Sequence, residues 1–339
     1  MPSSSIGLAV LGAGRIGALH VRNAARHVPG GHLVGVADVD TAAAARALAD
    51  TGVQRVDDAE RLLSDPAVQG VIIATPTHTH AALIAQAADA GKHVLCEKPI
   101  SFSLADTRVA MDQAKRAGVI LQVGFQRRFD QEFMQARRLV EDGSIGDVRF
   151  LRLVGRDHRM PSSAYLRTSG GQFKDQMVHE FDLARWIMAP IEIDEVYATG
   201  SALVDPAIAT FGDIDTSLVV LRFLGGPIGV IDDSREAVYG YDVRGEIQGS
   251  KGMMLVGQAR LRNGELLDAT HANADSDSFI ERFADAYRAE LVDFVRAIRE
   301  QRAPRVGALD ALEALRIAIA ADRSLRARRP IKLLEVADD

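Results

Sequence analysis

Residues 6–17 read Ile-Gly-Leu-Ala-Val-Leu-Gly-Ala-Gly-Arg-Ile-Gly, and this stretch decides the fold of the first half of the chain. Its first six residues are almost all apolar, as expected of a strand buried on both faces of a parallel sheet. A Gly-x-Gly-x-x-Gly pattern follows at Gly12, Gly14 and Gly17. After it, apolar residues recur with the spacing of a helix. The first glycine permits a tight turn, the second lets backbone approach a pyrophosphate, and the third lets the helix pack on the strand. The pattern predicts a dinucleotide-binding unit with phosphates at the helix N-terminus.

A carboxylate follows the second expected strand, at residues 33–37. Asp38 stands about twenty residues after the glycine pattern, where an acid accepts hydrogen bonds from the adenosine ribose and repels a 2′-phosphate. Its simpler interpretation is a strand-end turn residue, with Asp40 capping the next helix. Within the glycine loop, Arg15 either binds a phosphate or stays solvated, and Ile16 is also included among the predicted cofactor contacts. We therefore predict that the chain binds NAD.

Strands and helices alternate up to residue 123. After the first two strands, apolar strands are expected at residues 71–74, 94–96 and 120–123, and helices at residues 81–90 and 103–117. This alternation is typical of a doubly wound parallel sheet, the Rossmann architecture. We therefore predict an NAD-binding Rossmann domain over residues 1–123.

The stretch Glu97-Lys98-Pro99 follows one of these strands. Proline restricts the preceding residue to extended or turn conformations, so Lys98 cannot begin a helix. By itself, a lysine at a strand end is usually a solvated surface charge. Ligands of doubly wound sheets, however, bind beyond the carboxyl ends of the strands. Gly12, Asp38, Thr75 and Lys98 all stand at such ends, which makes Lys98 a predicted site residue.

The segment Thr75-Pro76-Thr77-His78-Thr79-His80 suggests a metal only superficially. Two histidines two residues apart do not share a helix face, and no third ligand stands at a characteristic spacing. A threonine that caps the following helix is the simpler interpretation, and no metal is predicted. Cys96, the one cysteine, is expected to be a small core residue.

The second half of the chain has a different pattern. Phe173, Met177, Phe181 and Ala184 repeat with helical spacing, so one helix is expected through residues 172–186. Asp175 and His179 are four residues apart and would lie side by side on it. A carboxylate beside an imidazole can form an acid–base dyad, because the imidazole titrates near neutral pH. The alternative is a helix-surface contact without a catalytic role.

Longer strands follow, without helices between them. They are expected at residues 195–203, 216–223, 228–232 and 242–248, with a Gly-Gly-Pro turn at residues 225–227. An amphipathic helix is expected at residues 279–299 and a last helix at residues 309–325. We therefore predict an α+β domain over residues 124–339, with a large, mainly antiparallel open sheet.

Composition sets the remaining bounds. A chain of 339 residues suggests two domains, and a net charge of −6 without a basic block indicates neither nucleic acid nor an anionic membrane as a partner. The absence of cysteine pairs, of a signal-like start and of a long apolar run predicts a cytoplasmic protein.

These motifs together resemble the Gfo/Idh/MocA family of oxidoreductases over essentially the whole chain, and most closely its bacterial inositol 2-dehydrogenases. Further stretches that carry the likeness are Gln122 to Asp130, Gly170 to Trp186, and Ala237 to Asp242. The resemblance implies a nicotinamide dehydrogenase that acts on a cyclic polyol or sugar as a homotetramer joined through its open sheets. It also implies a cis bond between Lys98 and Pro99.

The resemblance also implies a set of site residues. The implied catalytic residues are Lys98, Asp175 and His179, with His179 as the base, Asp175 orienting it and Lys98 stabilising the alkoxide. The nicotinamide side would be lined by Thr75, Pro76, His80, Glu97 and Gln126. The implied substrate contacts are Arg127, Asp157 and Tyr239.

One departure from the family pattern concerns the substrate. Lys174 and Gln176 stand where the inositol enzymes usually carry other residues, so Gln176 is expected to reshape the pocket. The alternatives are the same chemistry on an aldose or other sugar, or an NAD-binding regulator without turnover.

Overall fold

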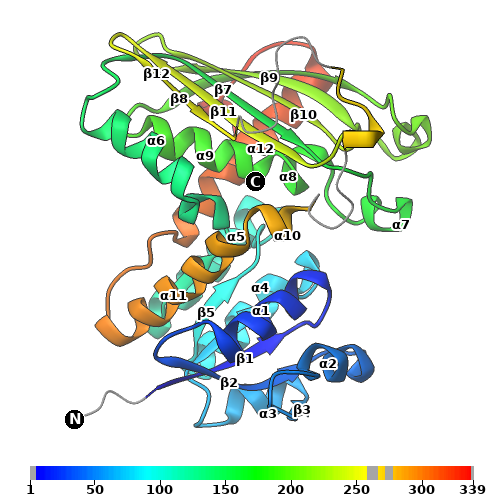
Figure 1. The fold of residues 1–339 in the computed structure, drawn as a ribbon, viewed down its shortest axis with the longest axis vertical. Coiled ribbons are helices and arrows are strands. Elements are labelled where there is room, and N and C mark those ends of the chain that lie inside the picture. The colour runs from blue at the N-terminus through cyan, green and yellow to red at the C-terminus, as the bar shows by residue number, and fades with distance from the viewer. Residues whose placement is uncertain (1–4, 258–265, 272–277, 337–339) are drawn as a thin grey trace. The chain divides into compact units, whose positions relative to one another are not determined.

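The computed structural model describes residues 5–257, 266–271 and 278–336, which fall into two compact units. The first contains the described part of Met1–Phe129 together with Ala284–Leu312. The second contains Asp130–Phe283 and Glu313–Asp338, again as far as they are described. Figure 1 labels the elements of both units.

The first unit is built on a six-stranded parallel sheet in the order β3-β2-β1-β4-β5-β6. Its strands are β1 (Ile6–Leu11), β2 (Gly31–Ala37), β3 (Val56–Asp57), β4 (Gly70–Ile73), β5 (His93–Cys96) and β6 (Leu121–Val123). The connecting helices are α1 (Arg15–Arg26), α2 (Thr41–Leu48), α3 (Ala59–Ser64), α4 (His80–Asp89) and α5 (Leu104–Ala117), with short 3₁₀ turns η1 (Thr77–Thr79) and η2 (Gln126–Phe129). The predicted doubly wound parallel sheet is thus confirmed.

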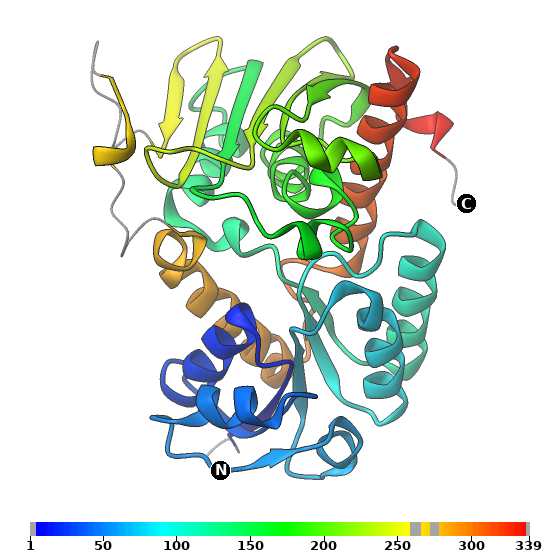
Figure 2. The same cartoon turned by 90° about the vertical axis from the view of Figure 1, so that its right-hand side faces the viewer.

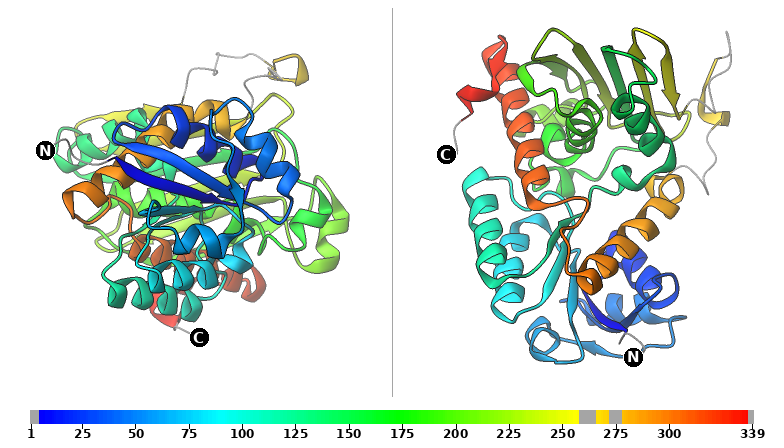
Figure 3. Two further views of the ribbon diagram at one scale, coloured as in Figure 1. Left: turned by 90° about the horizontal axis from the view of Figure 1, so that it is seen from below. Right: turned by 90° about the vertical axis from the view of Figure 1, so that its left-hand side faces the viewer.

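Helices cover both faces of this sheet. The view from below shows α1 and α2 on one side, together with the orange helix α11 (Ala284–Glu300), and α4 and α5 on the other (Figure 3). Strands with two covered faces have no side open to water, which is why β1 and β4 read as continuous apolar runs. The core on the α1 side contains Leu8, Val10 and Ile72.

Helix α11 belongs to the first unit and not, as expected, to the second. Leu291, Phe294 and Val295 belong to the core of the first unit, although the sequence assigned everything after residue 123 to a second domain. The amphipathic pattern showed that this helix packs on something apolar, but not on which sheet. The helix is also shorter than expected, because α10 (Phe279–Arg282) is separate from it.

The second unit contains a seven-stranded sheet in the order β12-β11-β7-β10-β9-β8-β13. Its strands are β7 (Val148–Arg156), β8 (Ile193–Ser201), β9 (Thr216–Phe223), β10 (Ile228–Ser234), β11 (Asp242–Gly249), β12 (Met253–Val256) and β13 (Ile331–Lys332). Only the β7–β10 pair of these ladders is parallel. The predicted α+β domain with a mainly antiparallel sheet is therefore confirmed.

Helices of this unit lie on one face of the seven-stranded sheet. The helices are α6 (Gln131–Glu141), α7 (Ser163–Leu166), α8 (Gln172–Asp175), α9 (Val178–Met188), α10 and most of α12 (Ala308–Ala327), and the unit also contains the 3₁₀ turns η3 (Pro206–Phe211), η5 (Ala269–His271) and η6 (Leu333–Glu335). Figures 1 and 2 show α6, α8 and α9 below that face. Along β9, buried Val219 and Leu221 alternate with half-exposed Leu218. This alternation is typical of a sheet whose other face is open.

Within the described residues, no helix is long and apolar enough to cross a membrane.

Candidate functional site

The glycine loop of the first unit has the geometry that its sequence predicts. Gly12 has a φ of +96°, and a Cβ there would lie 2.5 Å from the carbonyl oxygen of Ala74. A Cβ at Gly17 would overlap the carbonyl of Gly12. By contrast, a Cβ at Gly14 would meet no heavy atom within 4 Å, so its backbone is open to an approaching group. Helix α1 begins at the next residue and presents its free N–H groups there.

Asp38 lies beside this loop, at the carboxyl end of β2. Its Oδ2 accepts a hydrogen bond of 2.5 Å from the Ala13 N–H, and its Oδ1 accepts one of 2.8 Å from the Asp40 N–H. These bonds hold the carboxylate against the loop, and its oxygens can still accept further hydrogen bonds because each has two lone pairs. Asp40 caps α2 through its own side chain, as expected. A diphosphate at Gly14 and a ribose at Asp38 fit this donor and acceptor set, which is that of NAD.

His80 joins two of the loops at the carboxyl ends of the strands. Its Nε2 lies 2.7 Å from the carbonyl oxygen of Thr75, and its Nδ1 lies 2.9 Å from that of Pro99. Burial lowers the pKa of His80, against the opposing effect of these two carbonyls. The Thr75 hydroxyl also contacts that of Thr79 at 2.6 Å. A buried imidazole therefore ties the loop after β4 to the loop that carries Lys98.

Lys98 follows β5 and is half-buried, and the Lys98–Pro99 bond is cis, as the resemblance implied. Pro76 is exposed at the start of η1, whereas Gln126 and Arg127 are buried within η2, with 2% and 5% of their surface exposed. The structure therefore brings the predicted cofactor residues of the first unit to one edge of its sheet.

Glu97 belongs to a buried cluster that sequence reasoning did not find. His20 on α1 lies with its Nε2 2.7 Å from Glu97 Oε1, and the edge of its ring packs on Tyr287. Glu290 on α11 is fully buried, and neither of its carboxyl oxygens has a hydrogen-bond partner among the described residues. Burial and the nearby Glu97 raise the pKa of Glu290 well above its usual range.

This cluster has atoms of the types that bind metals. One atom each of His20, Glu97 and Glu290 lie within 4.8 Å of one another. Ligands about 2.1 Å from a tetrahedral zinc ion, however, lie more than about 3 Å apart. The 2.7 Å between His20 and Glu97 is a hydrogen-bond distance instead. The geometry is that of a hydrogen-bonded His20–Glu97 pair with the carboxyl group of Glu290 buried nearby.

In the second unit, the single helix expected through residues 172–186 is wrong. It is divided into α8 and α9, because the carbonyl of Gln172 accepts hydrogen bonds from both Gln176 N–H and Met177 N–H, at 3.0 Å each. The second bond spans five residues instead of four and widens the turn. Asp175 therefore ends one helix and His179 stands in the first turn of the next, so regular i, i+4 spacing does not describe the pair.

The carboxylate of Asp175 is held by two side chains that the sequence analysis missed. Tyr165 donates its hydroxyl to Oδ1 at 2.8 Å, and the fully buried Arg235 donates from Nη1 to Oδ2 at 3.1 Å. Arg235 also lies 3.6 Å from Asp213. His179 itself is half-buried.

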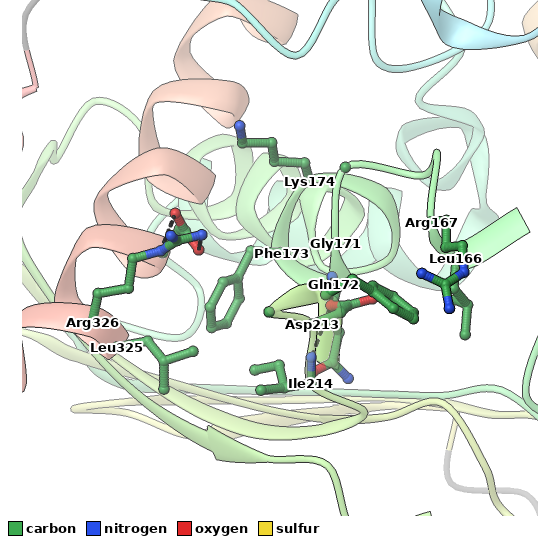
Figure 4. Close-up of a pocket in the computed structure, with 14 residues that line it drawn as sticks. Leu166, Arg167, Gly171, Gln172, Phe173, Lys174, Asp213, Ile214, Leu325 and Arg326 are labelled. Carbon is green, nitrogen blue, oxygen red and sulfur yellow. Dashed lines mark hydrogen bonds and ion pairs between the residues drawn. The ribbon is translucent and has the colours of Figure 1, made fainter. Parts of the chain in front are cut away.

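Gln176 lies in the turn between α8 and α9, and its expected effect on the substrate pocket stays a prediction. Its amide donates to the backbone carbonyl of Ser234 at 2.9 Å, at the end of β10, so it anchors the turn between α8 and α9. Lys174 instead lines a cavity of about 200 Å³ shown in Figure 4, beside Phe173, Asp322 and Arg326. Burial lowers the pKa of Lys174.

The last two predicted substrate residues lie near the ends of β7 and β11. The Tyr239 hydroxyl accepts from Arg156 and donates to Asp242, each at 2.9 Å, and burial raises its pKa. Asp157 follows β7, and its carbonyl accepts a hydrogen bond of 2.6 Å from the Ala237 N–H. The phenol of Tyr239 is thus oriented by two charged neighbours.

Comparison with known families gives two matches. Residues 6–125 match the GFO_IDH_MocA model, described as an oxidoreductase family with an NAD-binding Rossmann fold. Residues 133–255 match the GFO/IDH/MocA C-terminal domain.

Individual relatives extend over nearly the whole chain. The chain is 43% identical to the uncharacterized oxidoreductase YrbE of Bacillus subtilis, covering 96% of this chain and 95% of the relative. It is 41% identical to the myo-inositol 2-dehydrogenase of Thermotoga maritima, covering 97% and 99%. A structure of scyllo-inositol dehydrogenase from Lactobacillus casei with NAD(H) and scyllo-inositol bound is 28% identical, with a TM-score of 0.87 and coverage of 97% and 99%.

Proposed function

Because this chain belongs to the Gfo/Idh/MocA family of NAD-binding oxidoreductases, we propose that it oxidises one ring hydroxyl of an inositol, or of a related cyclic polyol, to the ketone. The observation that carries the proposal is the 41% identity to a myo-inositol 2-dehydrogenase over 335 residues. The relative solved with scyllo-inositol supports the same substrate class. YrbE, which is 43% identical, has no assigned substrate, so the test includes sugars outside this class.

The cofactor-binding residues of the first unit support NAD as the partner of this reaction. The open backbone at Gly14 and the N–H groups at the start of α1 can bind the diphosphate, while Asp38 can bind the ribose. Bound NAD supplies the hydride acceptor. The chain itself must bind the substrate, remove the hydroxyl proton and stabilise the charge that forms on oxygen.

We assign proton removal to His179 and charge stabilisation to Lys98. Imidazole titrates near neutral pH, and a positioned general base typically contributes about 10²–10⁴-fold in rate. A lysine ammonium donates a hydrogen bond to an oxygen as that oxygen gains negative charge. Asp175 has the supporting role, because a carboxylate stabilises an imidazolium.

The first experiment measures NADH formation from myo-inositol, scyllo-inositol, D-chiro-inositol and glucose, each with NAD and with NADP. Oxidation of an inositol with NAD is the expected result. Activity on glucose alone would keep the chemistry but reject the substrate class. Tight NAD binding without turnover on a broad polyol panel would favour a non-catalytic NAD-binding protein.

The second experiment replaces the assigned base. His179→Ala should lower kcat by about 10²–10⁴-fold while NAD affinity stays unchanged. His27→Ala provides the matched control, since His27 is an exposed histidine at the end of α1. Turnover of the His179 variant within a few-fold of the parent enzyme would show that the assignment is wrong.

A further inference from the structure

We propose that Arg235 is a positioning residue, which fixes the orientation of the Asp175 carboxylate so that it can support His179. This inference rests on the proposed function, because it takes His179 as the base of that reaction. It concerns residues of the second unit alone.

The position of Arg235 is set by the backbone. It directly follows β10, and its N–H donates to the carbonyl of Asp215 at 2.8 Å. The side chain is fully buried, so its charge must be balanced by protein groups and not by water. Two carboxylates supply that balance, Asp175 at 3.1 Å and Asp213 at 3.6 Å.

Asp213 is held in place by other bonds. Its Oδ1 accepts hydrogen bonds from the Gln172 N–H at 2.9 Å and the Ile214 N–H at 2.8 Å (Figure 4). Gln172 is the first residue of α8 and Asp175 is the last. Arg235 therefore connects both ends of this short helix to the end of β10.

The two oxygens of Asp175 are held by different kinds of partner. Tyr165, half-exposed, donates to Oδ1 without bringing a charge, whereas Arg235 binds Oδ2 with a full positive charge. Two bonds to separate oxygens fix the carboxylate plane. Of the two bonds, the one from the guanidinium is charge-assisted on both sides and is therefore the stronger.

This assignment explains why a widened turn stands between Asp175 and His179. A continuous helix would set the carboxylate by helical spacing alone, but here the turn is irregular and the side chain needs a separate anchor. Gln176 fixes the backbone of the turn through Ser234, the neighbour of Arg235. The end of β10 thereby fixes both the backbone and the carboxylate.

The test compares Arg235→Gln, Arg235→Lys and Tyr165→Phe with the parent enzyme. The measurements are kcat and KM on a substrate that the parent oxidises, and the affinity for NAD. Arg235→Gln should lower kcat by up to about 100-fold with KM nearly unchanged, because a small misplacement of a catalytic group can cost about that much in rate. NAD affinity should stay unchanged.

The other two variants separate charge from geometry. Arg235→Lys keeps the positive charge but not the planar guanidinium, so it should recover part of the lost kcat. Tyr165→Phe removes the uncharged partner alone and should lower kcat less than Arg235→Gln does. An Arg235→Gln variant with the kcat of the parent enzyme and only reduced thermal stability would overturn the proposal.

Two further measurements keep the test decisive. If Arg235→Gln does not fold, Arg235→Gln with Asp213→Asn removes one positive and one negative charge together and takes its place. If the parent enzyme oxidises no polyol, the proposed function fails, and the ¹³C chemical shift of the Asp175 carboxyl is then compared between the parent enzyme and Arg235→Gln at neutral pH, with Asp175→Asn identifying its signal. A chemical shift that Arg235→Gln leaves unchanged would overturn the role of Arg235.

Discussion

Both units bury ionisable groups at the carboxyl end of a sheet strand, but they balance the charge differently. In the first unit, Glu97 follows β5 and lies near His20 and the carboxyl of Glu290, which accepts no hydrogen bond from the part of the chain that the structure describes. In the second, Arg235 follows β10 and lies between two carboxylates. All members of the first cluster can gain or lose a proton, whereas a guanidinium stays protonated. We therefore expect the first cluster to make the free energy of unfolding depend on pH. The second should change that free energy mainly when one of its residues is replaced.

The largest effect is expected from removing the buried guanidinium. Arg235→Met leaves Asp175 and Asp213 without their cation, and breaking a buried ion pair on one side typically costs about 3–5 kcal/mol in the free energy of unfolding. Urea unfolding at neutral pH measures this loss. Asp213→Asn in the same chain should recover part of it, because one uncompensated carboxylate is then removed. A loss below about 1 kcal/mol, typical of surface pairs, would contradict this view of the cluster.

Glu290→Gln tests the first cluster, with a pH-dependent effect. Its pKa is raised above the ordinary value of 4.5 by burial, Glu97 and Asp293, so the folded state keeps a proton that the unfolded chain loses. The contribution of Glu290 to the free energy of unfolding is fully present below pH 4.5. It falls as pH rises toward the pKa of the folded state, by up to about 1.4 kcal/mol per pH unit. Glutamine does not titrate, so the variant should gain stability relative to the parent enzyme as pH rises.

Thermal unfolding of both proteins from pH 5 to pH 8 measures this difference. The other charged groups near Glu290 are common to both proteins, including His20, Glu97 and the Asp293–Arg302 pair, which has a 2.6 Å contact. A stability difference that does not change with pH would show that Glu290 is ionised when buried.

A smaller effect with the opposite sign is expected at His80. Burial lowers its pKa below the ordinary 6.5, so the unfolded chain takes up a proton more readily than the folded state does. The contribution of His80 to the free energy of unfolding is fully present above pH 6.5. It is lost as pH drops through the pKa of the folded state. His80→Gln should flatten that fall between pH 6.5 and pH 5. The slope of stability against pH is compared, because the substitution also changes packing. An unchanged slope would contradict the assignment.

The smallest effect on stability is expected from an exposed ion pair, which serves as a reference for the buried groups. Arg46 and Asp40 lie 3.4 Å apart, with 70% and 58% of their side chains exposed. Water and salt screen such pairs, so Arg46→Ala should leave the unfolding midpoint within experimental error. A clear shift of the unfolding midpoint would mean that the exposed fraction of the side chains does not predict how much an ion pair contributes to stability.

The sequence predicted the fold well because buried parallel strands and glycine turns leave local signals. The run before Gly12 and the acid at Asp38 could each be identified from residues that lie close to them in the sequence. The place of α11 could not, because an apolar stripe does not specify its partner. The candidate site residues that the sequence predicted follow strands or, like Asp175 and His179, were identified by their helical spacing.

The buried partners were harder to predict because they come from distant segments. Arg235 is sixty residues from Asp175 along the chain, and no local spacing relates them. Glu290 left one signal, since it lies on the apolar face of its helix, between Tyr287 and Phe294. A charged residue at such a position indicates a buried polar cluster. The widened turn after α8 left none, because its apolar spacing also fits a continuous helix.

The place of α11 has a consequence for how the protein is made. A ribosome completes all six strands of the first sheet, and then the whole of residues 130–283, before Leu291, Phe294 and Val295 emerge. Until then, part of the apolar surface of that sheet lacks its cover. Incompletely covered sheets are prone to aggregate, which is when chaperones act. The first unit of this protein therefore reaches its finished core only late in synthesis, although its strands are the first to be translated.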